Sequence, residues 1–259
     1  MRNAVEIKNV SKHFPVSRVP WYKNKVTLAL SHINLEVKEG ECFAFLGPNG
    51  AGKTTLIKTL CSIILPDEGE INIAGYNLQS QEEIAKSKIG LVTGEERSFY
   101  WRLTGRQNLE FFACFYDVPS LTAQNRIDRL AEHLGIYAQL DKRFQEYSTG
   151  TKQKVAIIRG LLNDPAILLI DEPTKSLDPA AAQDLRRFVK ELVAKQRKTI
   201  LFTTHQINEA EILSDRVAII DKGLIKAAGT ISELGKAISC PNASLYEIFT
   251  QLTRGDSKE

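Results

Sequence analysis

This sequence has few cysteines, no long apolar run and little net charge. Its 259 residues include four cysteines, Cys42, Cys61, Cys114 and Cys240, which lie far apart and form no CxxC pair. Such spacing is not that of a disulfide framework or of a cysteine-ligated metal site. We therefore expect reduced thiols that pack as small hydrophobic side chains.

No stretch approaches the roughly 18 consecutive apolar residues that span a bilayer. The N-terminal residues lack the basic-then-apolar layout of a signal peptide, so we expect a cytoplasmic protein. The net charge is only +3 and the basic residues are scattered, which is unlike a nucleic-acid-binding surface. With 43% hydrophobic and 25% charged residues, the composition is that of a globular chain with a sizeable core.

Two kinds of apolar periodicity alternate along the chain. Alternation with a period of two, or a short apolar run, is typical of a strand, whereas spacing of three or four residues is typical of a helix. The predicted strands are 5–10, 33–37, 42–46, 70–74, 167–170, 199–203 and 217–221, and the predicted helices are 53–64, 103–116, 123–134, 152–162, 180–195 and 209–214. Such alternation indicates a mostly parallel α/β sheet with helices on its faces.

The strand signal largely disappears between residues 94 and 162. We therefore expect an α/β core at about 1–93 and 163–235, with a helical subdomain inserted at about 94–162. Two prolines, Trp21 and Tyr22 break the pattern between residues 15 and 25, which we interpret as a loop or a small β-excursion. The tail from residue 255 is polar.

A glycine-rich run, Gly47-Pro-Asn-Gly-Ala-Gly-Lys-Thr54, follows a predicted strand and precedes a predicted helix. It fits the pattern G-x-x-x-x-G-K-[ST] in the context that supports such a match. Glycines let successive backbone N–H groups turn toward phosphate oxygens, and the helix N-terminus adds partial positive charge. Lys53 would reach the β- and γ-phosphates and the Thr54 hydroxyl would help to hold Mg²⁺. The run predicts a nucleotide site.

Two adjacent carboxylates end a buried strand in the run Ala166-Ile-Leu-Leu-Ile-Asp-Glu-Pro173. Ligands of an open α/β sheet bind at the carboxyl ends of its strands, so both acids should face the phosphates. One acid is needed to complete the Mg²⁺ shell and another to orient a water molecule. Asp171 and Glu172 suit these two tasks.

Further motifs follow in order along the chain. Tyr147-Ser-Thr-Gly-Thr-Lys-Gln153 is similar to a signature whose core is Leu-Ser-Gly-Gly-Gln, and Asp171-Glu-Pro-Thr-Lys-Ser-Leu-Asp178 is similar to a Walker B motif with its D-loop. Thr203-Thr-His205 is similar to a switch histidine after a strand, and Leu103-Thr-Gly-Arg-Gln-Asn-Leu109 to the opening of a helical subdomain. Together with the phosphate loop, these motifs make residues 5 to 230 resemble the nucleotide-binding subunits of ABC transporters.

That resemblance implies a P-loop NTPase core with a RecA-like mixed sheet, an antiparallel β subdomain and the inserted helical subdomain. It also implies a head-to-tail dimer that closes over two ATP molecules, with Ser148 and Gly150 supplied by the second copy. Residues 1–235 would form the ATP-binding domain. Residues 236–259 would form a short closing helix, similar to that of such subunits at Ser244–Phe249, and the polar tail.

The resemblance also assigns roles to individual residues. The expected nucleotide contacts are Phe14, Gly47, Pro48, Asn49, Gly50, Ala51, Gly52, Lys53, Thr54, Thr55, Ser148, Gly150 and Asp178, the expected Mg²⁺ ligands are Thr54, Asp171 and Glu95, and the expected catalytic residues are Glu172, His205 and Lys53. Phe14 would stack on adenine, with Trp21 and Tyr22 as rivals. His205 would hydrogen-bond the γ-phosphate.

The chain departs from the family pattern at several positions. Thr149 and Thr151 replace commoner residues of the signature, and Ser176 stands where the D-loop usually has Gly or Ala. No glutamine follows the strand at 89–92, where the family has its Q-loop, so either Glu95 or Gly94 takes that position. Because the acids and the histidine are intact, we expect an active ATPase.

Other features of the sequence predict the branch of the family and the partner. One nucleotide-binding unit and no long heptad block disfavour the translation-factor and chromosome-maintenance branches. The aromatic and arginine-rich segment Glu95–Arg102 suits the docking of a membrane permease, and it resembles exporter-type subunits that handle polysaccharides, lipids or drugs. We expect a peripheral protein at the inner face of the cell membrane, held there by the permease. The alternative is a soluble ABC-type ATPase of an assembly complex, such as those of iron–sulfur cluster assembly.

Overall fold

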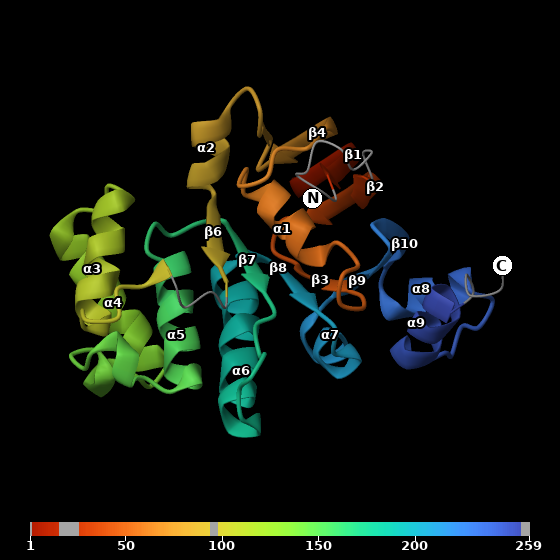
Figure 1. Ribbon diagram of the computed structural model, residues 1–259. Helices are drawn as coiled ribbons and strands as arrows, with labels where there is room; N and C mark the ends of the chain where they lie inside the picture. Colours follow the sequence, from red (N-terminus) through yellow and green to blue (C-terminus); the bar gives the residue numbers. More distant parts are fainter. Residues whose placement is uncertain (1, 16–25, 94–97, 255–259) are drawn as a thin grey trace.

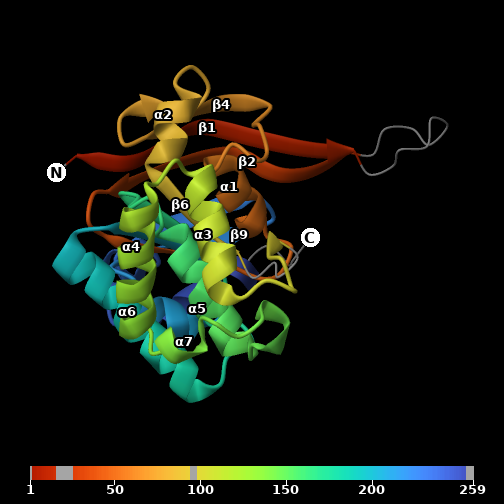
Figure 2. The ribbon, with the colours of Figure 1, turned by 90° about the vertical axis from the view of Figure 1, so that its left-hand side faces the viewer.

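Two sheets organise the chain, as seen in a computed structural model that describes residues 2–15, 26–93 and 98–254. The smaller sheet is antiparallel, with strand order β2–β1–β4–β5. Its members are β1 (Asn3–Pro15), β2 (Val26–Lys38), β4 (Glu68–Ile73) and β5 (Tyr76–Asn77). The long β1–β2 pair runs out past the body of the molecule (Figure 2).

The larger sheet has the order β10–β9–β3–β8–β7–β6. Its strands are β3 (Cys42–Leu46), β6 (Ile89–Val92), β7 (Ile167–Asp171), β8 (Thr199–Thr204), β9 (Arg216–Asp221) and β10 (Leu224–Gly229). All neighbouring pairs are parallel except β9 and β10. The expected mixed α/β sheet with an antiparallel β subdomain is therefore confirmed, and the parallel strands bring their carboxyl ends to one edge.

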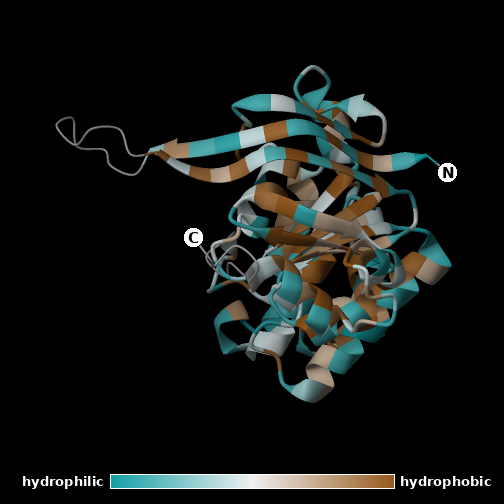
Figure 3. Cartoon of the chain, turned by 90° about the vertical axis from the view of Figure 1, so that its right-hand side faces the viewer, coloured by the Kyte–Doolittle hydropathy of each residue, from teal (hydrophilic) through white to brown (hydrophobic). Residues whose placement is uncertain are grey.

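Side-chain alternation along the strands creates a core on each face of the larger sheet. Phe43 and Phe45 of β3 point to the face covered by β1, β2, β4 and helix α1 (Lys53–Leu60). Cys42, Ala44 and Leu46 point to the opposite face and pack among the other helices. Figure 3 shows the apolar strands enclosed between these layers. The period of two thus decides which layer each strand residue meets.

Three helices form a group at one side of the sheet (Figure 1). They are α3 (Gly105–Phe115), α4 (Ser120–His133) and α5 (Thr149–Gly160). Helix α3 begins with a capping box in which Thr104 and Gln107 satisfy each other's backbone N–H groups. Gln107 thus supplies the N3 side chain of this helix start signal.

Helix α5 packs closely against β6. A Cβ atom at Gly90 would lie 1.9 Å from the carbonyl oxygen of Gly160, so the two backbones are too close to admit a side chain at this position. Next to this group, α6 (Pro179–Gln196) and α7 (Ile207–Leu213) cover the same face of the sheet.

The remaining helices are short or lie near the C-terminus. They are α2 (Glu82–Ser87), η2 (Tyr137–Gln139), η3 (Phe144–Glu146), α8 (Ile231–Ala237) and α9 (Leu245–Arg254). Helix α8 continues across residue 235, the expected end of the ATP-binding domain. Leu245 and Ile248 of α9 are buried in the same core as α3 to α7. In the described parts of the chain, no helix is both long and apolar enough to cross a membrane.

Some expected boundaries were wrong. The helix expected at 53–64 ends at Leu60, because Ser62 adopts a left-handed conformation with φ of 58° that cannot continue it. The strand expected at 33–37 is the inner part of the much longer β2. The elements predicted from periodicity did not include α2, β10 or α8.

Candidate functional site

The glycine-rich loop joins the end of β3 to the start of α1. Lys53 is the first residue of α1, and its Nζ donates to the carbonyl oxygens of Gly47 at 2.8 Å and Pro48 at 2.9 Å. Burial lowers the pKa of the Lys53 ammonium, while the nearby Glu172 and Asp171 carboxylates act in the opposite direction. The loop therefore holds a buried lysine at the N-terminus of a helix, which is favourable for an anion.

Two glycines of the loop leave no room for a side chain. Gly52 has φ of 105°, and a Cβ atom there would lie 2.4 Å from the carbonyl oxygen of Ala29. A Cβ atom at Gly47 would lie 2.1 Å from the carbonyl oxygen of Ile220. The loop is thus packed tightly between β2 and β9, so its backbone N–H groups are held in a fixed cradle.

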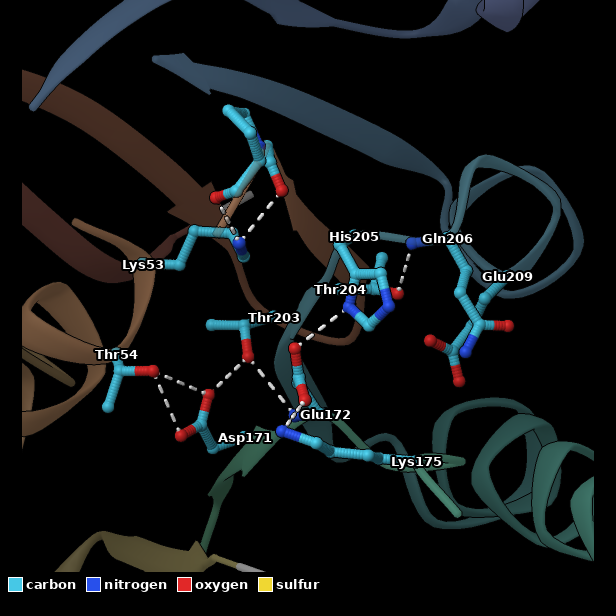
Figure 4. Close-up of polar contacts among 12 residues, drawn as sticks. Lys53, Thr54, Asp171, Glu172, Lys175, Thr203, Thr204, His205, Gln206 and Glu209 are labelled. Atoms are coloured by element: carbon cyan, nitrogen blue, oxygen red, sulfur yellow. Dashed lines mark hydrogen bonds and ion pairs between the residues drawn. The ribbon is translucent and has the colours of Figure 1, made fainter. Parts of the chain in front are cut away.

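Asp171 ends β7 and faces the same loop. Its carboxylate accepts from the Thr54 hydroxyl, at 3.2 Å and 3.1 Å for its two oxygens. The Thr203 hydroxyl of the neighbouring strand β8 also donates to it. Figure 4 shows the two hydroxyl groups on either side of this carboxylate. Hydroxyl groups from two separate segments, α1 and β8, therefore fix its orientation.

Glu172 takes a left-handed backbone conformation, with φ of 52°, that is uncommon for a residue with a side chain. Its N–H donates to the Thr203 carbonyl oxygen at 3.2 Å and to the Thr203 hydroxyl at 3.1 Å, which supports the strained turn. The turn carries the Glu172 side chain away from β7 toward His205, which follows β8 (Figure 4).

Both oxygens of the Glu172 carboxylate have cationic or donor partners. His205 Nδ1 lies 2.9 Å from Oε1, and Lys175 Nζ lies 2.6 Å from Oε2. Burial raises the pKa of the Glu172 carboxyl, but Lys175 and His205 together outweigh it, and the pKa is lowered. The carboxylate is therefore held ionised, as an acceptor for protons of a nearby molecule.

Lys53, Thr54, Asp171, Glu172 and Lys175 line a cavity of about 310 Å³. It is lined by Thr27, Leu28, Ala29, Asn49, Gly50, Gly52, Lys53, Thr54, Thr55, Asp171, Glu172 and Lys175. A phosphate loop, a helix N-terminus, two lysines and two carboxylates thus face a common space. Such an arrangement suits a phosphate ester together with a cation.

The residues here fit a magnesium ion. The Thr54 hydroxyl and the Asp171 carboxylate are hard oxygen donors at hydrogen-bond distance from each other, beside a phosphate cradle. Mg²⁺ bound by protein side chains usually takes one or two such oxygens and completes its shell with water and substrate phosphates. The third expected ligand, Glu95, lies outside the described residues, as does its rival Gly94.

The expected adenine contacts are only partly placed. Phe14 pairs with Thr27 across the β1–β2 ladder, and Lys12 Nζ lies 5.7 Å from its ring centroid. Thr27 lines the cavity, whereas Phe14 does not. Its rivals Trp21 and Tyr22 lie outside the described residues.

The expected contacts that follow the helical subdomain's first two helices, Ser148, Gly150 and Asp178, do not line this cavity either. Ser148 is the N-cap of α5, where its hydroxyl accepts from the Thr151 N–H and lies 3.0 Å from the Thr151 hydroxyl. Gly150 is in the first turn of the same helix. Asp178 caps α6 by accepting from the N–H groups of Ala180 and Ala181, a structural function that its short side chain explains.

Two important residues of the site were missed by the sequence analysis. Thr203 was noted only as part of the run before His205, and Lys175 only as part of the D-loop. Pairing of β7 with β8 places Thr203 beside Asp171. A turn places Lys175 beside Glu172, which lies three positions earlier in the chain. Neither relationship has a local sequence signal.

A family model described as ABC transporter matches residues 30–175 of the chain. A second model, described as AAA domain, putative AbiEii toxin, Type IV TA system, matches residues 141–211. The first match covers more than half of the chain and includes the glycine-rich loop, the capping serine of α5 and the two carboxylates.

Curated relatives extend this likeness over most of the chain. The ABC transporter ATP-binding protein NatA of Bacillus subtilis is 34% identical over 235 residues, which are 91% of this chain and 95% of that protein. The Nod factor export ATP-binding protein I of Neorhizobium galegae is 33% identical over 226 residues, which are 87% of this chain and 64% of that protein.

Solved structures of ATP-binding subunits and cassettes are also similar to this chain. An ATP-binding subunit of an ABC transporter matches with a TM-score of 0.81 and 29% identity, covering 96% of this chain and 99% of that one. The dimeric post-hydrolysis state of an ATP-binding cassette, bound to ADP and Pi, matches with a TM-score of 0.76 and 25% identity, covering 88% and 98%.

Proposed function

The chain belongs to the ABC transporter family of ATP-binding, ATP-hydrolysing subunits, and we propose that it powers export through a separate membrane permease. In this proposal, ATP closes a head-to-tail dimer of the chain, and hydrolysis reopens it. The protein would be cytoplasmic and held at the inner face of the membrane by the permease. Residues 1–235 would be the ATP-binding domain, with the helical subdomain at about 94–162, and residues 236–259 the closing helix and tail.

The observation that carries the proposal is the gathering of Lys53, Thr54, Asp171 and Glu172 around one cavity. Lys53 would neutralise the β- and γ-phosphates, and Thr54 and Asp171 would hold Mg²⁺, which supplies further charge neutralisation when bound. Glu172 would accept a hydrogen bond from the attacking water, and His205, 2.9 Å from it, would hold that carboxylate in place beside the γ-phosphate.

The dimer is supported by where the signature lies. Ser148 and Gly150 stand at the start of a helix, with the partial positive charge that suits a phosphate, yet neither lines the phosphate cavity of its own chain. A second copy placed head to tail would present them to that cavity. A relative of this chain has been solved as a dimer with ADP and Pi.

The permease would dock on exposed aromatic side chains beside α3. Tyr100 and Phe115 are exposed, and the ring of Phe111 lies 4.9 Å from each of theirs. Trp101, which follows Tyr100 in the chain, is 47% exposed, and Lys152 Nζ lies 5.2 Å from its ring centroid. Aromatic residues supply much of the binding energy at interfaces. The export direction rests on relatives such as the Nod factor export protein.

Capture of membrane partners tests this proposal. Detergent-solubilised membranes of the source organism are passed over immobilised wild type, over Trp101→Ala and over a control, Tyr246→Ala, which removes a 60% exposed aromatic on α9. We expect an integral membrane protein to be retained by wild type and the control and lost with Trp101→Ala, while thermal unfolding shows all three folded. Retention of soluble assembly proteins alone would favour the iron–sulfur-type alternative.

A further inference from the structure

We propose that Lys175 is a second phosphate-binding lysine, whose ammonium group exchanges the Glu172 carboxylate for the terminal phosphate of a bound nucleoside triphosphate. The inference rests on the proposed nucleotide site and deepens it, because neither the motifs nor the family comparison assigns Lys175 a role. Its substrate class is a nucleotide that carries a γ-phosphate.

The first support is position. Lys175 lies in the turn that leaves β7, where its N–H donates to the Glu172 carbonyl oxygen at 3.3 Å. Its side chain lines the same cavity as Lys53, Gly50 and Thr54. Figure 4 shows the two lysines reaching this region from different elements, Lys53 from α1 and Lys175 from the turn beyond Glu172.

The second support is the difference between the two lysines. Lys53 is buried and its ammonium is bonded to two carbonyl groups of the phosphate loop. The Lys175 side chain is 65% exposed and is tied to Glu172 by an ion pair of 2.6 Å. An exposed ammonium on a flexible stem loses little hydration when it changes partner, so it suits an exchange.

The third support is charge. Around the cavity, Lys53 and Lys175 balance Asp171 and Glu172, so a triphosphate enters a region of about zero net charge. A terminal phosphate with about two negative charges attracts the ammonium group more strongly than one carboxylate at the same distance. Lys53 lies at the loop end of the cavity, whereas Lys175 lies beside Glu172, where the phosphate under attack must sit. The terminal phosphate is therefore the natural partner of Lys175.

The exchange has a consequence for hydrolysis. Lys175 forms an ion pair with Oε2, which is buried and accepts no hydrogen bond, and His205 Nδ1 lies 2.9 Å from Oε1. Transfer of the ammonium to the γ-phosphate frees Oε2 to accept a hydrogen bond from water. A diphosphate lacks the γ-phosphate and leaves the ion pair in place. Lys175 would thus make Glu172 available only when a triphosphate is bound.

Nucleotide binding tests the proposal. The non-hydrolysable triphosphate AMP-PNP and ADP are titrated with Mg²⁺ into wild type, Lys175→Gln, Lys175→Arg and Lys236→Gln, the last of which makes the same charge change on an exposed position of α8. We expect Lys175→Gln to weaken AMP-PNP binding by roughly threefold to tenfold and ADP binding by less than about twofold. Lys175→Arg should retain most of the affinity, and Lys236→Gln all of it. Equal effects on both nucleotides, or none, would overturn the exchange.

A second arm separates exchange from a fixed ion pair. If Lys175 leaves Glu172 for the phosphate, Glu172→Gln frees the lysine and tightens AMP-PNP binding, and Lys175→Gln abolishes that gain. If the pair is fixed, Glu172→Gln tightens AMP-PNP binding more in the Lys175→Gln background than in the wild-type background. The reason is that the negative charge of the carboxylate is unneutralised only when Lys175 is absent. Lys53→Ala is the control for the site itself: unchanged binding of both nucleotides to that variant would reject the phosphate cavity, independently of Lys175.

Discussion

The Thr54 hydroxyl lies 3.1 Å and 3.2 Å from the two oxygens of the Asp171 carboxylate, although 117 positions separate the two residues in the chain. Strand order explains this proximity, since β3 and β7 flank β8 and end at the same edge of the sheet. A phosphate cradle and a carboxylate that are far apart in sequence thus form one site.

Thr203→Val should impair hydrolysis without unfolding the protein. The substitution keeps the shape but removes the hydroxyl that donates to Asp171 and accepts from the Glu172 N–H. We expect kcat to fall roughly tenfold to a hundredfold and stability to fall by about 1–3 kcal/mol. The control is Thr199→Val, which removes a buried hydroxyl from the opposite end of the same strand, where it accepts from the Gly40 N–H. Equal kcat values for the two variants would remove Thr203 from the site.

Lys53→Ala should weaken the binding of both ATP and ADP by about tenfold to a hundredfold, because the phosphates lose a charged hydrogen-bond donor. Fluorescence titration of each nucleotide measures the effect. The buried side chain also bonds two loop carbonyls, so circular dichroism must show that the variant is folded. Unchanged affinity in a folded variant would contradict the assignment of the loop.

His205→Ala should bind ATP as wild type does and lose hydrolysis by at least about a hundredfold, because Glu172 loses the partner at its Oε1 atom. The chain offers a matched control in His133→Ala, since His133 Nε2 pairs with Glu191 at 2.8 Å on the surface of α4 and α6. That variant should keep full activity. Hydrolysis at the wild-type rate by His205→Ala would show that the histidine is not required.

Gly90→Ala should destabilise the attachment of α5 to the larger sheet. The new methyl group would lie 1.9 Å from the Gly160 carbonyl oxygen and 2.8 Å from Pro165 Cγ, so β6 and α5 must separate. We expect a loss of about 2–3 kcal/mol in the free energy of unfolding, measured by urea denaturation. A loss below about 0.5 kcal/mol would mean that the packing here is not tight.

Much of this site could be predicted from the sequence, because its motifs are local. The loop Gly47–Thr54 and the strand end at Asp171 lie where the pattern placed them, and β3 has the expected bounds of 42–46. Their approach to one another required only the rule that parallel strands end at one edge. The roles given to these residues remain predictions.

The rest depends on tertiary contacts that leave no local pattern. The position of Thr203 beside Asp171 depends on which strand pairs with β7, and the Lys175–Glu172 ion pair depends on a turn with two left-handed residues, Glu172 and Ser176. The end of α1 was also missed, because a single left-handed serine decides it. Nothing in the periodicity of the sequence encodes these backbone conformations.

The most direct test of the account is the Glu172→Gln variant, examined by phosphate release and by light scattering after size-exclusion chromatography with and without ATP and Mg²⁺. Loss of the carboxylate should not weaken ATP binding but should reduce turnover by about a hundredfold to ten-thousandfold, so that an ATP-dependent dimer accumulates. Turnover close to that of wild type, or a variant that binds ATP and stays monomeric, would contradict the proposal that Glu172 drives hydrolysis in a closing dimer.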